Sequence, residues 1–214
     1  VEDISARLKT MALPFGQQQI IEFEQNPFLK GLEFITPLYN AILYKRPLNL
    51  VYHSFKSEDQ MDLLIHPYYL KQYNQRWFLF GWNQEKDFLM NLALDRIQAV
   101  SEAQAPFLEN TTIDFTEYFE DVVGVTIPRD SKTEEVILEI KKERWPYLET
   151  KPLHGSQKVI ARNPDSVVIQ LAIKPNYEFI SLLLSLGEGV KVVSPDWLPL
   201  EIKRKLEKIL NDYF

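Results

Sequence analysis

The sequence has no cysteine among its 214 residues. Disulfide bonds, zinc sites built on thiolates and cysteine nucleophiles are therefore excluded. Histidine is also scarce, because the chain contains only His53, His66 and His154, and their wide spacing does not favour a histidine-rich metal site. We expect neither a bound metal ion nor a cofactor.

Long apolar runs are missing as well. No apolar stretch reaches the ~18 residues that a membrane-spanning helix needs. The first residues, Val1 to Ile4, lack the basic region and the apolar core of a signal peptide. We therefore expect a cytoplasmic protein without a membrane partner. The sequence begins with Val1 rather than Met, so we expect it to be part of a longer protein.

The motifs of common enzyme classes are also lacking. The sequence contains neither the glycine-rich phosphate loop of P-loop and Rossmann proteins nor the Gly-x-Ser-x-Gly elbow of serine hydrolases. Glu117, Glu120 and Asp121 lie close together, but such a charge run is more typical of a solvated face. We expect no catalytic residue and no enzyme activity.

Positive charge is in short supply over the whole chain but not in one stretch. The net charge is −6, which argues against a general duplex-DNA binder, because such proteins need a basic footprint. Residues 63–84, however, contain no acid, and they hold Lys71, Arg76 and seven aromatic residues. Basic residues interleaved with aromatics predict a stacking surface for bases. Aromatic filling of a strand-rich core is the alternative.

The first half of the chain predicts one helix and five strands. Thr36 and Pro37 are typical of a helix start, and the helix should end before Pro47. Pro67 predicts an edge or a bulge where it follows the second strand. Five short strands after one helix favour a small, strongly bent barrel. The predicted strands are 48–55, 61–66, 76–82, 88–94 and 97–103.

The second half predicts the order β-α-β-β-α-β-α, and its first six elements are the ferredoxin-like sequence. Asn176 should cap the second of these helices, and Gly187 should end it. The predicted strands are 135–141, 158–162, 166–173 and 190–193, and the predicted helices are 142–150, 176–186 and one from about residue 199. In the last helix we expect Leu200, Leu206, Ile209, Leu210 and Tyr213 to be buried.

Two neighbouring motifs are the strongest indication of function. Residues 76–82 read Arg-Trp-Phe-Leu-Phe-Gly-Trp, and residues 92–97 read Leu-Ala-Leu-Asp-Arg-Ile. The turn-like residues 83–87 separate them, so the two strands should lie antiparallel and share one surface. Aromatic faces and guanidinium groups on one surface suit an anionic or nucleobase-like ligand.

These motifs resemble those of a known family. Trp77-Phe78-Leu79 is similar to the Trp-Tyr-Leu triplet of the WYL domain of bacterial transcriptional regulators, with Phe78 in place of the tyrosine. The further points of match are Tyr52, His66-Pro67, Leu70 and residues 94–97. Residues 186–198 resemble a signature of the C-terminal extension that often follows a WYL domain. Many WYL domains carry an arginine near Met90 and Ala93, so this pocket should hold less positive charge.

The resemblance implies an α+β chain with two domains. Residues 36–105 would form an Sm- or SH3-like barrel, and residues 133–214 would form a ferredoxin-like extension with an added C-terminal helix. Residues 1–35 would be an N-terminal linker or helical segment, and residues 106–132 a linker between the domains.

The resemblance also implies a function. WYL domains of studied relatives sense nucleic-acid-like ligands, including single-stranded DNA, while an N-terminal winged helix-turn-helix contacts promoter DNA. No such unit is readable here, so the chain would be the effector half of a regulator. Its ligand would be a nucleotide or a single-stranded nucleic acid. It would assemble as a homodimer. The alternative is an assembly module without a small ligand.

Seven residues are the candidate ligand contacts, each with a structural alternative. Arg76 and Arg96 would grip an anion or form ordinary ion pairs. Trp77 would stack on a base or fill the core, and Lys71 would bind the ligand or stay solvated. A ligand or a backbone group must satisfy the amide of Asn91. The full set is Tyr52, His66, Lys71, Arg76, Trp77, Asn91 and Arg96.

Overall fold

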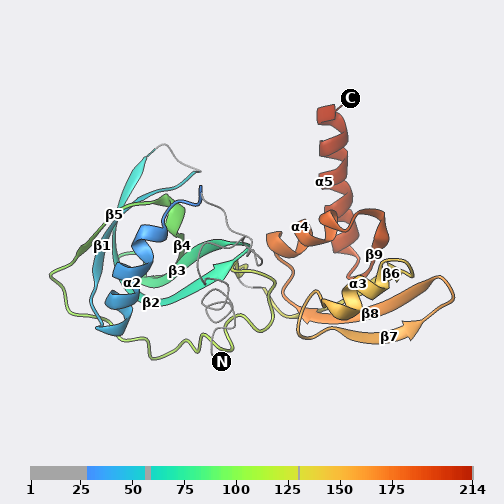
Figure 1. Ribbon diagram of the computed structural model, residues 1–214, viewed down its shortest axis with the longest axis horizontal. Helices are drawn as coiled ribbons and strands as arrows, with labels where there is room; N and C mark the ends of the chain where they lie inside the picture. Colours follow the sequence, from blue (N-terminus) through green and yellow to red (C-terminus); the bar gives the residue numbers. More distant parts are fainter. Residues whose placement is uncertain (1–27, 56–58, 130, 214) are drawn as a thin grey trace, which may run out of the picture.

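The structure, a computed structural model, describes residues 28–55, 59–129 and 131–213. Most of the predicted N-terminal segment, residues 1–27, lies outside the described residues. The described chain forms two lobes, each with its own sheet and its own buried core (Figure 1). We call residues 32–102 the first lobe and residues 134–213 the second lobe.

The first lobe is a five-stranded antiparallel sheet with one helix against it. Its strand order is β4-β3-β2-β1-β5, so the chain meanders from β1 to β4 and then returns to pair β5 with β1. The strands are β1 (Leu48–His53), β2 (Gln60–Tyr73), β3 (Arg76–Asn83), β4 (Phe88–Ala93) and β5 (Ile97–Glu102), and the short helix η2 (Leu94–Arg96) joins the last two. No ladder joins the edge strands β4 and β5 in the described residues, so the closed barrel stays a prediction.

The helix of the first lobe begins earlier than predicted. It is α2 (Ile35–Leu43), its N-cap is Phe34, and η1 (Leu32–Phe34) precedes it, so Thr36 is not the cap. A tertiary contact accounts for the shift: Gly31 has φ +87°, and a Cβ there would collide with the backbone of Leu94. The turn before the helix is therefore fixed against η2, and the helix ends ahead of Pro47 as predicted.

Pro67 lies inside the longest strand of the first lobe. The register between β2 and β3 shifts between Pro67 and Tyr69, which confirms the predicted bulge. The strand does not end there but continues to Tyr73, and it lies between β1 and β3 rather than at an edge. The bulge lets the chain pass a residue that has no N–H to donate.

The second lobe has a four-stranded antiparallel sheet in the order β7-β8-β6-β9. Its strands are β6 (Glu134–Lys141), β7 (Lys158–Arg162), β8 (Ser166–Ile173) and β9 (Val190–Ser194), and its helices are α3 (Trp145–Thr150), α4 (Tyr177–Ser185), η3 (Gly187–Gly189) and α5 (Trp197–Tyr213). This confirms the predicted order of strands and α-helices, while the name ferredoxin-like stays a prediction. None of the helices in the described ranges is long and apolar enough to cross a membrane.

Local signals set the limits of α4. Asn176 is its N-cap, because the Asn176 Oδ1 accepts a hydrogen bond from the N–H of Phe179 at 2.8 Å. Gly187 follows the helix with φ +59°, a conformation that favours glycine after a helix. Phe179 and Leu183 then point into the core of the second lobe.

The last helix contradicts the burial predicted for it. α5 begins at Trp197, and Leu198 is its buried residue among those described. The five residues expected to be buried are exposed instead: Leu206 by 45%, Ile209 by 46%, Leu210 by 57%, Leu200 by 67% and Tyr213 by 80%. Figure 1 shows the reason, because α5 extends away from the sheet and its far end meets no other element of the lobe.

Candidate functional site

A cavity of about 560 Å³ lies at one end of the sheet of the first lobe. Strand register brings its walls together: Phe78 pairs with Ala93, so Arg76 and Asp95 lie opposite each other just beyond that pair. η2 then carries the chain from β4 across to β5. The cavity is lined by Phe28, Leu29, Lys30, His53, Phe55, Arg76, Asp95, Arg96, Ile97 and Gln98.

Two arginines in this cavity have defined orientations. The Nε of Arg76 lies 3.4 Å from Oδ2 of Asp95, whose side chain is only 11% exposed. The guanidinium carbon of Arg96 lies 4.5 Å from the centre of the Phe55 ring, a cation–π contact. One carboxylate and one aromatic ring therefore hold two guanidinium groups in fixed positions on one wall.

The same constellation contains polar atoms that lack partners. Nε of Arg96 and Oδ1 of Asp95 are buried without a hydrogen bond to any described residue. Tyr52, only 5% exposed, lies beside them. Burial raises the pKa of Tyr52, and the charge of Arg96 lowers it to a smaller extent. Tyr52 is therefore a neutral phenol next to Arg96.

A second cavity, of about 550 Å³, lies where the two lobes meet. Arg76 and Arg96 line this cavity as well as the first one. Its other wall includes Thr126, from the segment between the lobes, and Glu178, at the start of α4. The Thr126 hydroxyl donates a hydrogen bond of 2.6 Å to Oε1 of Glu178. The two arginines thus lie between a pocket of the first lobe and the joint to the second.

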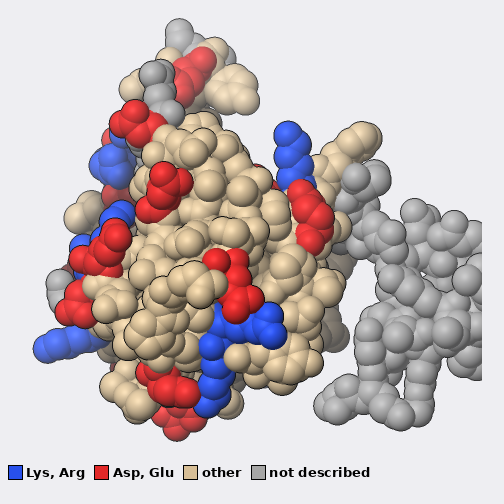
Figure 2. All heavy atoms as spheres, turned by 90° about the vertical axis from the view of Figure 1, so that its left-hand side faces the viewer, with Lys and Arg blue, Asp and Glu red and all other residues tan. Residues whose placement is uncertain are grey.

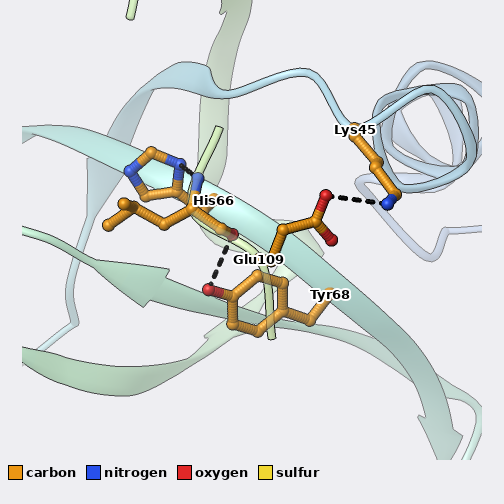
Figure 3. A network of polar contacts seen from close by, with 5 residues as sticks. Lys45, His66, Tyr68 and Glu109 are labelled. Carbon is orange, nitrogen blue, oxygen red and sulfur yellow. Dashed lines mark hydrogen bonds and ion pairs between the residues drawn. The ribbon is translucent and has the colours of Figure 1, made fainter. Parts of the chain in front are cut away.

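His66, predicted as a ligand contact, has a structural role instead. It is fully buried, and its Nδ1 accepts a hydrogen bond of 3.1 Å from the N–H of Leu108 (Figure 3). Tyr68 donates to the carbonyl of Leu108 at 3.0 Å, and Lys45 pairs with Glu109 at 2.7 Å. Burial lowers the pKa of His66, so the ring is neutral and anchors the segment that follows the first lobe.

Lys71 also contacts the segment between the lobes and not the cavity. Its ammonium group lies 4.1 Å from the centre of the Phe119 ring, and burial lowers its pKa. Phe119 belongs to a cluster in which Phe115 stacks on Tyr69 with ring centres 4.7 Å apart. Phe80 meets this cluster edge-on at 5.0 Å from Phe119. The segment around Phe115 and Phe119 is a run of turns, and its aromatic side chains pack against the first lobe.

The amide of Asn91 has a backbone partner. Its Nδ2 donates a hydrogen bond of 2.8 Å to the carbonyl of Val125, in the segment between the lobes. Trp77 packs against the core of the first lobe and does not line either cavity at the arginines. Of the seven candidates, the structure therefore brings Arg76 and Arg96 into the cavity, places Tyr52 behind them, and locates the other four elsewhere.

The sequence-based prediction missed most of the lining residues, among them Lys30, His53 and Phe55. His53 is the last residue of β1, and Phe55 follows it by two positions, outside the strand. No local pattern marks Lys30, because only the folded chain brings it close. Asp95 was noted as half of an Asp-Arg pair, but its bond to Arg76 depends on strand register.

On the face of the first lobe that Figure 2 shows, the described Lys and Arg side chains do not gather into one patch. Figure 2 shows the outer face of the first lobe, where Lys and Arg side chains lie next to Asp and Glu and most of the described surface is uncharged. The salt bridge of 3.0 Å between Arg46 and Glu102 is an example of such neutralised pairs. No group of three potential metal ligands occurs in the part of the chain that the structure describes.

The comparisons with known proteins agree with this division into lobes. Residues 33–102 match the family model of the WYL domain, and residues 132–210 match that of the WCX domain. A comparison with curated proteins gives no match.

Two solved structures are similar to the chain. The proteasome accessory factor B/C (PafBC) of Arthrobacter aurescens has a TM-score of 0.36 and 16% identity over 89% of this chain and 28% of its own. A CRISPR Cas-related protein has a TM-score of 0.48 and 14% identity over 86% of this chain and 51% of its own. The chain therefore spans about a quarter and about half of these two proteins.

Proposed function

We propose that this chain, which belongs to the WYL-domain regulators that also carry a WCX domain, senses an anionic, nucleic-acid-like ligand in the cavity that contains Arg76 and Arg96. One observation carries the proposal: three separate elements bring two oriented guanidinium groups and an aromatic ring into one cavity. Such a cavity favours a ligand with both a phosphate and a planar base.

The electrostatics of the cavity support an anion. The chain as a whole has a net charge of −6. The cavity differs from this average, because Lys30, Arg76 and Arg96 line it together with one acid, so its own charge is positive. Asp95 holds Arg76 in place, and Phe55 holds Arg96, so binding costs little side-chain ordering. Nε of Arg96 has no partner among the described residues.

The size of the cavity favours a small ligand or a short piece of a strand. A volume of about 560 Å³ lies within the range of typical small-molecule pockets, roughly 300–1,000 Å³. This volume suits a mononucleotide or one to two nucleotides of a single strand, not a duplex. The net acidity of the chain agrees with that choice.

The second cavity connects the proposed ligand site with the joint between the two lobes. Because Arg76 and Arg96 line both cavities, an anion bound to them also changes the charge that faces Thr126 and Glu178. Such a ligand shifts the arrangement of the lobes only if it binds one arrangement more tightly than another. We propose that this shift reaches a promoter-binding domain other than the two lobes.

The expected fold type of each lobe, the oligomeric state and the location of the protein belong to the same proposal. The sheet order of the first lobe supports an Sm- or SH3-like barrel, and that of the second supports a ferredoxin-like domain. We propose a cytoplasmic homodimer without cofactor or enzyme activity. The alternative function, an assembly module without a small ligand, is favoured by the exposed apolar face of α5.

Binding measurements test the proposal. Fluorescence anisotropy with labelled single-stranded DNA and RNA, and calorimetry with mononucleotides, should give saturable binding to the full chain. Arg76→Ala and Arg96→Ala should each weaken binding about 10-fold or more, because a charge-assisted hydrogen bond contributes about 1.5–3 kcal/mol. Affinity should also fall as salt rises.

Arg46→Ala is the matched control. It removes the same charge from the same lobe, at a site that lies outside both cavities with arginines and is paired with Glu102. It should leave binding unchanged. The proposal fails if no probe binds, or if all three arginine variants lose affinity equally, since that result would reflect net charge and not the cavity.

A further inference from the structure

The cavity that contains Arg76 and Arg96 offers two further groups that can donate hydrogen bonds. The side chains of Lys30 and His53 line it, and neither has a hydrogen bond or an ion pair to a residue that the structure describes. The two arginines, by contrast, are each held by a neighbour, one by a carboxylate and one by an aromatic ring. Lysine carries three N–H donors and a neutral histidine carries one, so these donors are available to an anion.

These four side chains come from four separate segments of the chain. Lys30 lies just before η1, and His53 ends β1. Arg76 begins β3, and Arg96 ends η2. Cations that follow one long groove are typical of proteins that bind a strand along its length. Cations that reach one cavity from separate segments suit a single phosphate group instead.

The charge of the cavity matches a terminal phosphate better than an internal one. Three of the lining residues, Lys30, Arg76 and Arg96, carry a positive charge and one, Asp95, carries a negative charge, so two positive charges remain. Glu178 lines the second cavity and not this one. An internal phosphodiester carries about one negative charge, whereas a terminal phosphate, which is a phosphomonoester, carries about 1.5 to 2 at pH 7. A phosphomonoester therefore neutralises the cavity more completely.

A terminal phosphate also has one more oxygen atom to bind. It presents three free oxygens that accept hydrogen bonds, whereas an internal phosphate presents two, because its other two oxygens are esterified. The guanidinium groups of Arg76 and Arg96 can bind both kinds of phosphate. Lys30 and His53 are left for the third oxygen and for the second charge, so these two side chains can distinguish the two ligands.

We propose that this cavity binds a phosphomonoester, either a free nucleoside monophosphate or the phosphorylated end of a single strand, and that Lys30 and His53 select it over an internal phosphodiester. The inference rests on the proposed function, because it names the ligand class of the same cavity. Phe55, whose ring is 67% exposed, is the stacking surface for the base next to the phosphate. A volume of about 560 Å³ has room for this base and the phosphate together.

Calorimetry with the full chain tests the inference on short single strands of one sequence that differ only in their terminal group. A phosphate at one of the two ends should raise the affinity about 10-fold over the strand with two terminal hydroxyls, because one more charged group is bound. A methyl ester of that phosphate has the charge of an internal phosphate and should bind like the hydroxyl strand. A nucleoside monophosphate distinguishes the two sources: equal affinity means that the free nucleotide is sufficient, and lower affinity means that the strand end is the ligand. Both results support the inference.

Variants of the two unpaired side chains show whether they cause this preference. Lys30→Gln with His53→Leu should bring the affinities of the phosphorylated and the hydroxyl strand to within about twofold of each other, because the donors for the third oxygen are lost. Arg76→Ala should weaken the binding of both strands. Lys86→Gln is the matched control, since it removes the same charge from the exposed turn after β3, outside both cavities with arginines, and it should leave the preference unchanged.

The outcomes separate this inference from the proposed function. Strands that bind with equal affinity with and without a terminal phosphate overturn the inference and leave the proposed function standing. A methyl ester that binds as tightly as the phosphate also overturns it, because the second charge then plays no part. A preference that Lys86→Gln abolishes as well would reflect net charge and contradict the selective role of Lys30 and His53. If neither a strand nor a nucleotide binds, the inference and the proposed function fail together.

Discussion

The first lobe gathers charged side chains around a cavity, whereas the second lobe uses its polar side chains to join its own elements. Arg76, Asp95 and Arg96 have their free polar atoms in or beside the cavity. In the second lobe Asn176 caps α4, and the Ser166 hydroxyl donates to Glu139 on the neighbouring strand at 2.8 Å. The difference indicates a ligand-responsive lobe and a lobe built for stability and assembly.

The segment between the lobes makes different contacts with each of them. It meets the second lobe through directional bonds, because the amide of Asn176 donates to the carbonyls of Val123 and Thr126, at 2.8 Å each. It meets the first lobe through aromatic packing and through further hydrogen bonds, among them those of Asn91 with Val125 and of His66 with Leu108.

The largest effects should come from removing one buried ring in each lobe. Phe80→Ala and Phe179→Ala should each lower the free energy of unfolding by about 3–5 kcal/mol, because each deletes a ring that is at most 2% exposed. Since Phe80 lies on β3 of the first lobe and Phe179 in the core of the second, each variant should shift a different transition in a calorimetric scan. If both variants shift one shared transition equally, the two lobes unfold as one unit.

Intermediate losses of stability should come from breaking the hydrogen bonds that attach the linking segment to each lobe, and the two losses should differ in size. Asn176→Ala removes a helix cap and leaves two carbonyls without their donor, so it should cost about 2–4 kcal/mol. Asn91→Ala removes one partly buried bond and should cost about 1–2 kcal/mol.

Hydrogen exchange locates these two losses. Asn176→Ala should increase exchange in α4 and in residues 121–126, whereas Asn91→Ala should increase exchange only around residue 125 and leave α4 protected. Equal effects of the two variants on α4 would contradict the claim that the segment is fixed to the second lobe.

The smallest effect should be a pH dependence contributed by one histidine in each lobe. Burial lowers the pKa of His66 and of His154 below the ordinary value of about 6.5. The unfolded chain therefore binds more protons than the folded chain below that pH, so stability is complete above about pH 6.5 and falls as the pH drops. Protonation of Nδ1 of His66 would also break its bond to Leu108.

Thermal melts at pH 7.5 and 5.5 measure this effect for each lobe. His66→Gln should reduce the pH dependence of the transition of the first lobe, and His154→Gln that of the second. His53→Gln, which changes a histidine that lines the cavity, is the control. An unchanged pH dependence in both of the first two variants would show that other groups cause it.

Sequence patterns predicted most of the fold because they depend on neighbouring residues. The alternation in residues 135–141, the cap at Asn176 and the glycine at 187 each act over a few positions, and the corresponding elements are observed there. The predicted cap at Thr36 was wrong because the contact between Gly31 and Leu94 fixes the helix start, and that contact joins residues far apart in sequence.

The candidate site was predicted less completely, for the same reason. Arg76 and Arg96 were expected together because their two motifs lie on strands joined by a short turn. His66 and Lys71 were expected beside them because their residue types suit a ligand, but the segment at 107–119 covers both. No sequence pattern shows which part of a chain a later segment will cover.

By itself, the sequence determined the order of the elements, the two-lobed organisation and the pair of arginine-bearing motifs. These follow from periodicity, turn residues and caps, which act along the chain. The tertiary structure alone decided which polar groups border a cavity and which are buried, and it left the apolar face of α5 exposed. Burial depends on which distant segments meet, and that is a property of the folded chain and of its partners.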